Sequence, residues 1–213
     1  AGRRVRLFGT NIAGEGLFLP DEDAASLAVR LRQFGFNVLR LHMFDSVRPG
    51  TIWQDAEKGI IDPEQLRKLD FLIAECAKNG IYVNVNLHAA RAYPGMPDDV
   101  RRRREFSRSE TFDGWYPPYI GMLKAYASQL FDHVNPYLRR RYAEEPAIAC
   151  IEINNENTLV EECRDVYRAL PEPFRSTFLS QWTEWLKRKY GTTRALADAW
   201  NRDVVPLGGE ILG

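Results

Sequence analysis

Residues Ile151 to Asn157 read IEINNEN, and this short stretch is the most informative part of the sequence for the fold. Apolar and polar side chains alternate along it, so that Ile151 and Ile153 share one face while Glu152 and Asn154 share the other. A period of two is typical of a β-strand, in which successive side chains point to opposite sides of the sheet. The stretch therefore predicts a strand with one apolar and one polar face.

Two earlier stretches repeat this alternation. Residues 38–42 read VLRLH and residues 83–88 read VNVNLH, again with Arg, Asn or His on one face. Strands of a parallel sheet that is covered on both faces read as nearly continuous apolar runs, and these strands do not. A barrel explains the pattern, because its polar residues gather inside near the carboxyl ends of the strands, where such barrels place their sites. An open sheet with one hydrated face is the alternative.

The apolar runs alternate with longer segments of helical period, which is the order that builds a parallel sheet covered by helices. The second helix has the clearest start, because Asp62 suits the N-cap, Pro63 the first helical position and Gln65 the end of a capping box. Gly35 and Gly80 end the first two helices. The predicted strands are residues 5–11, 36–41, 81–87 and 148–153, and the predicted helices are residues 24–34, 63–79, 119–138, 174–190 and 193–200.

The composition excludes several classes of protein. The 213 residues carry 29 basic and 29 acidic side chains, so we expect neither a nucleic-acid nor a membrane partner. No apolar run reaches the ~18 residues of a spanning helix, and the first residues lack a secretion signal, which leaves the localisation unknown, with a secreted or periplasmic location still open. The 3 cysteines fit neither a disulfide scaffold nor a metal site, and nothing points to a cofactor.

Glu156 is the leading candidate for a catalytic residue. It follows the fourth predicted strand, at the edge where the polar residues of the other strands gather. A carboxyl group walled by apolar and aromatic residues can hold its proton near neutral pH and donate it to a leaving-group oxygen. The competing interpretation is an ordinary surface glutamate in a loop.

The stretch from Ile151 to Asn157 also resembles the strand-4 signature of the retaining glycoside hydrolases of clan A, such as the cellulase and mannanase group of family 5. Other landmarks of that resemblance occur in the expected order: VLRLH at residues 38–42, VNLH at 85–88, and WTEWLKRKYG at 182–191 followed by Ala199 and Trp200. The resemblance implies a (β/α)8 TIM-barrel fold with only about the first four β/α units present. Residues 1–213 would then be a single catalytic-type domain, the N-terminal half of the barrel.

The resemblance also implies a role for each matching residue. Glu156 becomes the general acid/base, and Asn155 donates to the sugar 2-hydroxyl, a contact that tightens as oxocarbenium character develops. Arg40 becomes a positioner of the nucleophile, while His88 binds a hydroxyl or supports residues that do. His42, at the end of the same strand as Arg40, joins them as a substrate-binding candidate.

The order of the amide residue Asn155 and the acid Glu156 in the sequence conflicts with the alternation of a strand. Strict alternation places Asn155 on the face opposite Glu156. Either the strand ends or kinks at this point, or Asn154 takes the contact instead.

Retaining hydrolysis also needs a second carboxylate, about 5–5.5 Å from the first, which attacks the anomeric carbon. In the clan this nucleophile lies on strand 7, beyond four β/α units. The other acidic residues weighed as nucleophiles read better as loop charges or, for Glu152, as a buried partner of Arg40: Glu15, Asp45, Glu152 and Glu161. We therefore expect part of a longer enzyme, inactive as an isolated chain, that associates with its missing half or with itself through exposed sheet edges.

Several aromatic residues fall in predicted loops at the strand ends, where they could stack on sugar rings. Trp53 and Trp115 are the chosen candidates because both lie among polar, Gly and Pro residues. A packing role is as good an interpretation for either one. The run Arg101 to Arg104 suits an acidic polysaccharide, although such runs are more often solvated surface.

Two other functions compete with the hydrolase. A metal-dependent barrel enzyme would use His42, His88 and Glu156 as ligands, but the chain has only 3 histidines and no paired His motif. A non-catalytic carbohydrate-binding half-barrel would keep the aromatic and polar lining without the nucleophile.

Overall fold

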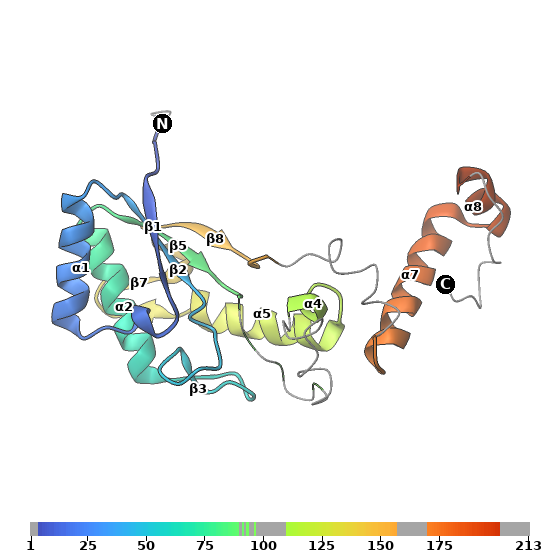
Figure 1. Cartoon of the computed structure of the whole chain (residues 1–213), viewed down its shortest axis with the longest axis horizontal. Coiled ribbons are helices and arrows are strands. Elements are labelled where there is room, and N and C mark those ends of the chain that lie inside the picture. The colour runs from blue at the N-terminus through green and yellow to red at the C-terminus, as the bar shows by residue number, and fades with distance from the viewer. Residues whose placement is uncertain are drawn as a thin grey trace.

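The computed structural model describes residues 4–89, 91, 93, 96, 110–156 and 170–200. Within these residues, four strands form one parallel sheet in the order β1-β2-β5-β8 (Figure 1). The strands are β1 (Gly9–Ala13), β2 (Val38–His42), β5 (Tyr82–Asn86) and β8 (Ile148–Glu152). The order of the strands across the sheet is the same as their order along the chain, which confirms the predicted series of β/α units.

Three helices, α1 (Asp21–Gln33), α2 (Pro63–Lys78) and α5 (Pro117–Phe131), pack around one main core. Leu39 and Leu41 of β2 and Val83 and Val85 of β5 are fully buried in this core, as the alternation predicts. The start of α2 confirms the predicted N-cap, since the side chain of Asp62 accepts from the backbone N–H groups of Glu64 at 2.8 Å and Gln65 at 3.0 Å. The predicted capping box does not form, because the backbone N–H of Asp62 donates to the carbonyl oxygen of Ile52 at 2.8 Å instead of to the side chain of Gln65. The opposite face of the sheet carries the polar residues, and β1 and β8 are its two edges.

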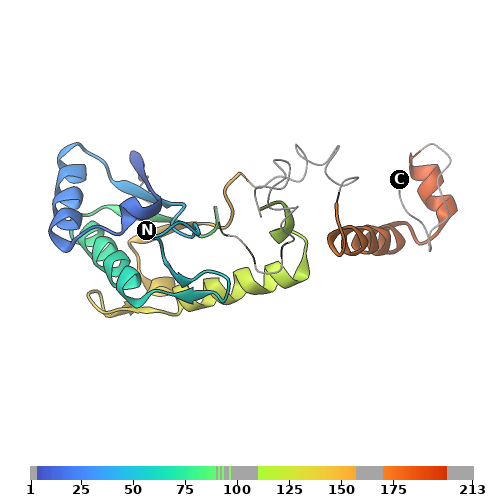
Figure 2. The ribbon, with the colours of Figure 1, turned by 60° about the horizontal axis from the view of Figure 1, so that its bottom comes forward.

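A second, smaller cluster joins α4 (Glu110–Asp113) and the start of α5 to the start of α7 (Phe174–Tyr190). Its members are Tyr93, Met96, Phe112, Trp115, Tyr119, Leu170 and Phe174. Figures 1 and 2 both show α7 and α8 (Thr193–Trp200) beyond the end of α5, away from the sheet.

The outer face of β8 corrects one prediction. Ile151 and Ile153 were expected to face a helix, as the buried Val85 does on the neighbouring strand, but they are 46% and 64% exposed. Among the described residues, helices cover the central strands, while α7 lies too far away to cover β8. Residue type alone does not bury a strand face, because burial also needs a covering element.

Some predicted boundaries of strands and helices were wrong. The first strand begins at Gly9 rather than at residue 5, since the pairing with β2 starts where Gly9 meets Val38. The third helix ends at Phe131 rather than at residue 138, because Asn135 turns the chain by accepting from the backbone N–H groups two and three residues later. Two hairpins were not predicted: β3 (Trp53–Asp55) with β4 (Ile60–Ile61), and β6 (Val134–Asn135) with β7 (Arg140–Arg141).

Among the described residues, no helix has the length and apolar character needed to span a membrane.

Candidate active site

Arg40 lies at the centre of the polar face, close to the carboxyl ends of the strands. Its Nε and Nη2 atoms donate to Glu152 Oε2 at 2.7 Å and Oε1 at 2.6 Å, which is a bidentate ion pair between β2 and β8. Its Nη1 atom donates to Asn11 Oδ1 on β1 at 3.1 Å. Its Nη2 atom also donates to Asn155 Oδ1 at 2.9 Å. One guanidinium group therefore joins β1, β2, β8 and the segment after β8. The predicted partnership with Glu152 is confirmed, but Glu152 is only partly buried.

The electrostatic interactions between Arg40 and Glu152 favour the ionised form of each side chain. Hydrogen bonding to Arg40 lowers the pKa of Glu152, against a smaller opposing effect of partial burial. Hydrogen bonding to Glu152 raises the pKa of Arg40, and the charges of Glu152 and Glu156 raise it further. The side chains of Arg40 and Glu152 are 26% and 27% exposed, so water screens the pair only in part.

The position of Asn155 resolves the tension between amide and acid. The strand β8 ends at Glu152, so strict alternation stops before Asn155 is reached. The backbone N–H of Asn155 donates to the carbonyl oxygen of His88 at 3.0 Å, which holds this segment against the end of β5. Asn155 is therefore the residue that reaches Arg40, on the same side of the sheet as Glu152.

Glu156 follows directly in a left-handed backbone conformation, with φ at 51°. This conformation is uncommon for a residue with a side chain and is often found at functional sites. The side chain is exposed, so the apolar and aromatic wall that we expected is not found among the described residues. Glu156 is nevertheless close enough to Arg40 for its charge to raise the pKa of the guanidinium.

The two histidines expected at the site have different surroundings. His42 is half-buried, and its Nδ1 atom donates to Asn86 Oδ1 at 2.6 Å. His88 is fully buried, with its two ring nitrogens facing Asp45 and Asp113. His88 therefore lies behind the polar face and contacts carboxylates rather than open space.

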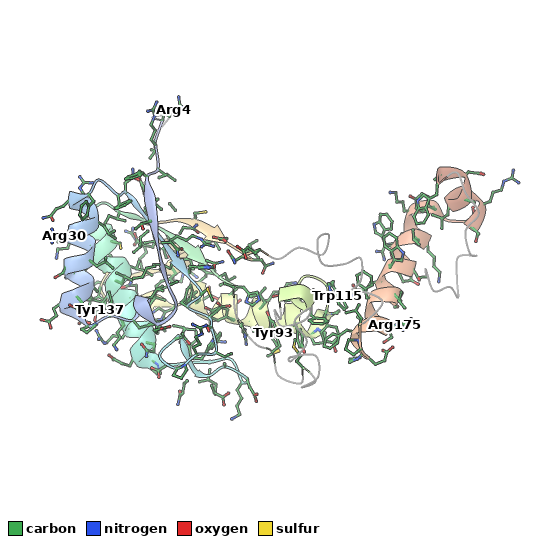
Figure 3. The ribbon with its side chains drawn as sticks, viewed as in Figure 1. Arg4, Arg30, Tyr93, Trp115, Tyr137 and Arg175 are labelled. Carbon is green, nitrogen blue, oxygen red and sulfur yellow. The ribbon has the colours of Figure 1, made fainter. Side chains whose placement is uncertain are left out.

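The two chosen tryptophans both have packing contacts. Trp53 lies at the start of β3 rather than in a loop, and its indole N–H donates to the carbonyl of Asp45 at 2.7 Å. Trp115 is 7% exposed and packs beside Phe112 in the second cluster, where Figure 3 shows it near α4 and α7. Sugar stacking by either residue stays a prediction.

The remaining acidic residues and the arginine run have different outcomes. Glu15 is exposed in a short 3-10 helix (Gly14–Leu17), and Glu152 is paired with Arg40. Asp45 is not the solvated loop charge that we expected, because it is fully buried beside His88. Glu161 and the run Arg101 to Arg104 lie outside the described residues.

Sequence reasoning missed a set of buried polar residues below the strand ends. Asp113 lies next to His88, and Arg91 lies over the rings of Trp53, Tyr93 and Tyr126, at 4.7 Å, 5.3 Å and 5.6 Å. No local pattern pairs Asp113 with His88, since they are far apart in sequence. For Asp45, its place shortly after the second strand was the available signal.

The described part of the chain holds no group of three or more His, Cys, Asp or Glu side chains that could bind a metal ion. His42 is hydrogen-bonded to an amide, and the ring nitrogens of His88 contact two carboxylates, so the ring nitrogens of the two histidines do not converge with Glu156.

One of the comparisons with known proteins shows the family of the chain. The sequence model described as Cellulase (glycosyl hydrolase family 5) matches residues 1–201. A comparison with curated protein sequences finds no match.

Solved structures with a similar fold include mannanases and a mannosidase, by their titles. The endo-1,4-β-mannanase from Rhizomucor miehei is 17% identical with a TM-score of 0.59, over 88% of this chain and 54% of that one. The endo-β-1,4-mannanase from Thermotoga petrophila is 19% identical with a TM-score of 0.53, over 95% and 42%. The family 5 mannosidase from Rhizomucor miehei is 15% identical with a TM-score of 0.54, over 84% and 48%.

These matches show the fold, which is the (β/α)8 TIM-barrel type represented by the first four β/α units. The chain spans about half the length of these structures, between 42% and 54%.

Proposed function

Because the chain belongs to glycosyl hydrolase family 5, we propose that it is the acid/base half of a retaining hydrolase of β-linked glycans. One observation carries this proposal. Asn155 is bonded to Arg40 through its side chain and to His88 through its backbone, so that the following Glu156 is held at the carboxyl ends of the parallel strands.

The geometry assigns a direction to the amide of Asn155. Arginine has only donor hydrogens, so the atom that faces Arg40 is the amide oxygen and not the nitrogen. The Nδ2 group is thereby oriented as the donor for a substrate. A sugar 2-hydroxyl that accepts this hydrogen bond would gain most in the transition state, when positive charge develops at the anomeric carbon.

Glu156 would act in both halves of the reaction. It first gives its proton to the glycosidic oxygen as the leaving group departs, and then takes a proton from the water that attacks the covalent intermediate. Its exposure in this half of the barrel leaves room for the remaining half to cover it. That cover would lower the local dielectric and raise the proton affinity of the carboxyl group.

The nucleophile would come from the other half of the barrel. Among the described acidic residues near the site, Glu152 is paired with Arg40 and Asp45 is buried below the strand ends. The open edges β1 and β8, with Ile151 and Ile153 exposed beside β8, are the surface on which four further β/α units would complete the sheet. The partner is thus a C-terminal half-barrel, and the ligand is an oligo- or polysaccharide.

Turnover assays test this proposal. A protein that joins residues 1–213 to the C-terminal half should hydrolyse aryl β-glycosides or β-1,4-linked mannan and glucan, and Glu156→Gln should abolish turnover. Glu184→Gln, at an exposed position on α7, is the matched control and should leave activity unchanged. Binding of glycans without turnover would favour a non-catalytic binding domain, and activity lost on chelation would favour a metal enzyme.

A further inference from the structure

An imidazole between two carboxylates lies just below the proposed site. The Nδ1 atom of His88 is 2.7 Å from Asp45 Oδ2, and its Nε2 atom contacts Asp113 Oδ2. All three side chains are fully buried. Carboxylates accept hydrogen bonds, and both ring nitrogens can donate only when the ring is a cation. A carboxylate on each side of the ring therefore favours the imidazolium form of His88.

Further polar groups surround the triad formed by His88, Asp45 and Asp113. Tyr93 donates from its hydroxyl to Asp113 at 3.3 Å and places its ring against that of His88, with centroids 5.8 Å apart. Asp45 accepts from the backbone N–H of Ala89 at 3.1 Å, and the Arg91 guanidinium is the other nearby positive charge. Burial lowers the pKa of His88, but hydrogen bonds to Asp113 and Asp45 raise it to about 10.

The backbone of His88 links the triad to the site. Its carbonyl oxygen accepts from the backbone N–H of Asn155 at 3.0 Å and from Asn86 Nδ2 at 3.2 Å. Asn155 directly precedes Glu156. The position of the His88 carbonyl oxygen therefore determines the position of the Asn155 backbone, and with it the position of Glu156. Asp113 lies on α4, the helix that contributes Phe112 to the second cluster. Asp45 and His88 follow strands of the main sheet, so the triad also connects the second cluster to that sheet.

We propose that Asp45 and Asp113 are positioning residues that clamp the His88 imidazolium and thereby hold the Asn155–Glu156 segment in place. Neither aspartate touches substrate. The catalytic consequence rests on the proposed function, whereas the clamp itself does not. In this arrangement His88 supports the site through its backbone carbonyl, and its ring binds no sugar hydroxyl.

Histidine ring NMR tests the clamp in the chain itself. The chain has only 3 histidines, so replacing His42 or His133 by Asn assigns the three rings. His88 should keep both ring protons through about pH 8, above the ordinary range of histidine. An imidazole that becomes neutral at the ordinary histidine pKa in the unmodified chain would overturn the proposal.

Asp113→Asn removes one charge of the clamp at constant shape, with Asp132→Asn as a control at an exposed position at the end of α5. The variant should lower the pH at which His88 titrates and speed the exchange of the Asn155 amide proton by about tenfold or more. The control should change neither. Unchanged exchange at Asn155 in Asp113→Asn would overturn the proposal.

If that variant does not fold, Tyr93→Phe makes the milder change, since it removes only the hydroxyl that donates to Asp113. It should move both the titration of His88 and the exchange rate of the Asn155 amide in the same direction.

Activity separates the clamp from the proposed function. In the protein completed by its C-terminal half, Asp113→Asn should reduce kcat on the order of tenfold to a hundredfold with KM little changed, because the acid is displaced but no substrate contact is lost. A rise in KM at constant kcat would contradict the positioning role. A completed protein with no glycosidase activity, but with the His88 and Asn155 responses intact, would refute the proposed function and support the clamp.

Discussion

Arg40 donates from Nη2 to Asn155 Oδ1 at 2.9 Å while it forms a bidentate pair with Glu152. The same guanidinium therefore completes a contact between two strands and orients the amide that precedes the proposed acid. A change in the shape of this side chain should affect both the stability of the sheet and the geometry of the site.

Arg40→Lys keeps the charge but loses the planar fork that binds Glu152 at two points. We expect the free energy of unfolding to fall by roughly 2 kcal/mol, because hydrogen bonds to charged, partly buried groups are lost. Denaturant titration followed by circular dichroism measures the change. Arg194→Lys, at an exposed pair on α8, should stay within about 0.5 kcal/mol of the unmodified chain. Equal effects at the two positions would contradict the role assigned to Arg40.

The pKa of Glu152 predicts how stability depends on pH. Hydrogen bonding to Arg40 lowers the pKa of Glu152 in the folded chain, so folding favours the ionised carboxylate. This contribution is present above the unfolded value of about 4.3 and is lost as the pH falls through the lower folded value. The difference in unfolding free energy between the unmodified chain and Glu152→Gln should therefore shrink as the pH falls below about 4. A difference that stays constant over this range would show that the pair does not stabilise the fold.

Cysteine labelling tests completion of the barrel. Cys150 is exposed on β8, on the same face as its pairing neighbour Asn84, whereas Cys76 is buried and burial raises the pKa of its thiol to about 12. In a Cys163→Ser background, Cys150 should react quickly with a maleimide and Cys76 slowly. When the C-terminal half is present, the interior of the barrel is packed and labelling of Cys150 should slow strongly. An unchanged rate at Cys150 would argue against a closed barrel.

The sequence was most informative where local pattern and tertiary structure agree. The alternation at residues 38–42 and 83–88 predicts which side chains enter the core, and the structure confirms that set. The polar set is less uniform, because Arg40 lies on the polar face whereas the ring of His88 is buried behind it. The N-cap at Asp62 is a local hydrogen-bonding pattern and could be predicted from three residues.

Several of the failures depend on partners distant in sequence. Ile151 has the residue type of a buried position but lacks a covering helix among the described residues. Asp113 joins His88 only because α4 is brought against the end of β5, and no periodicity in the sequence reports that approach. Strand pairing with Val38, rather than residue preference, determines where β1 begins.

The most direct test of the central claim is chemical rescue of Glu156→Ala in the protein completed by its C-terminal half. Loss of a general acid/base should slow hydrolysis of substrates with poor leaving groups on the order of 10²–10⁴-fold, while substrates with good leaving groups still form the covalent intermediate. Azide needs no general base to attack that intermediate, so it should restore turnover and yield the β-glycosyl azide. Equal losses for both kinds of substrate, with no effect of azide, would contradict the assignment of Glu156 as the acid/base.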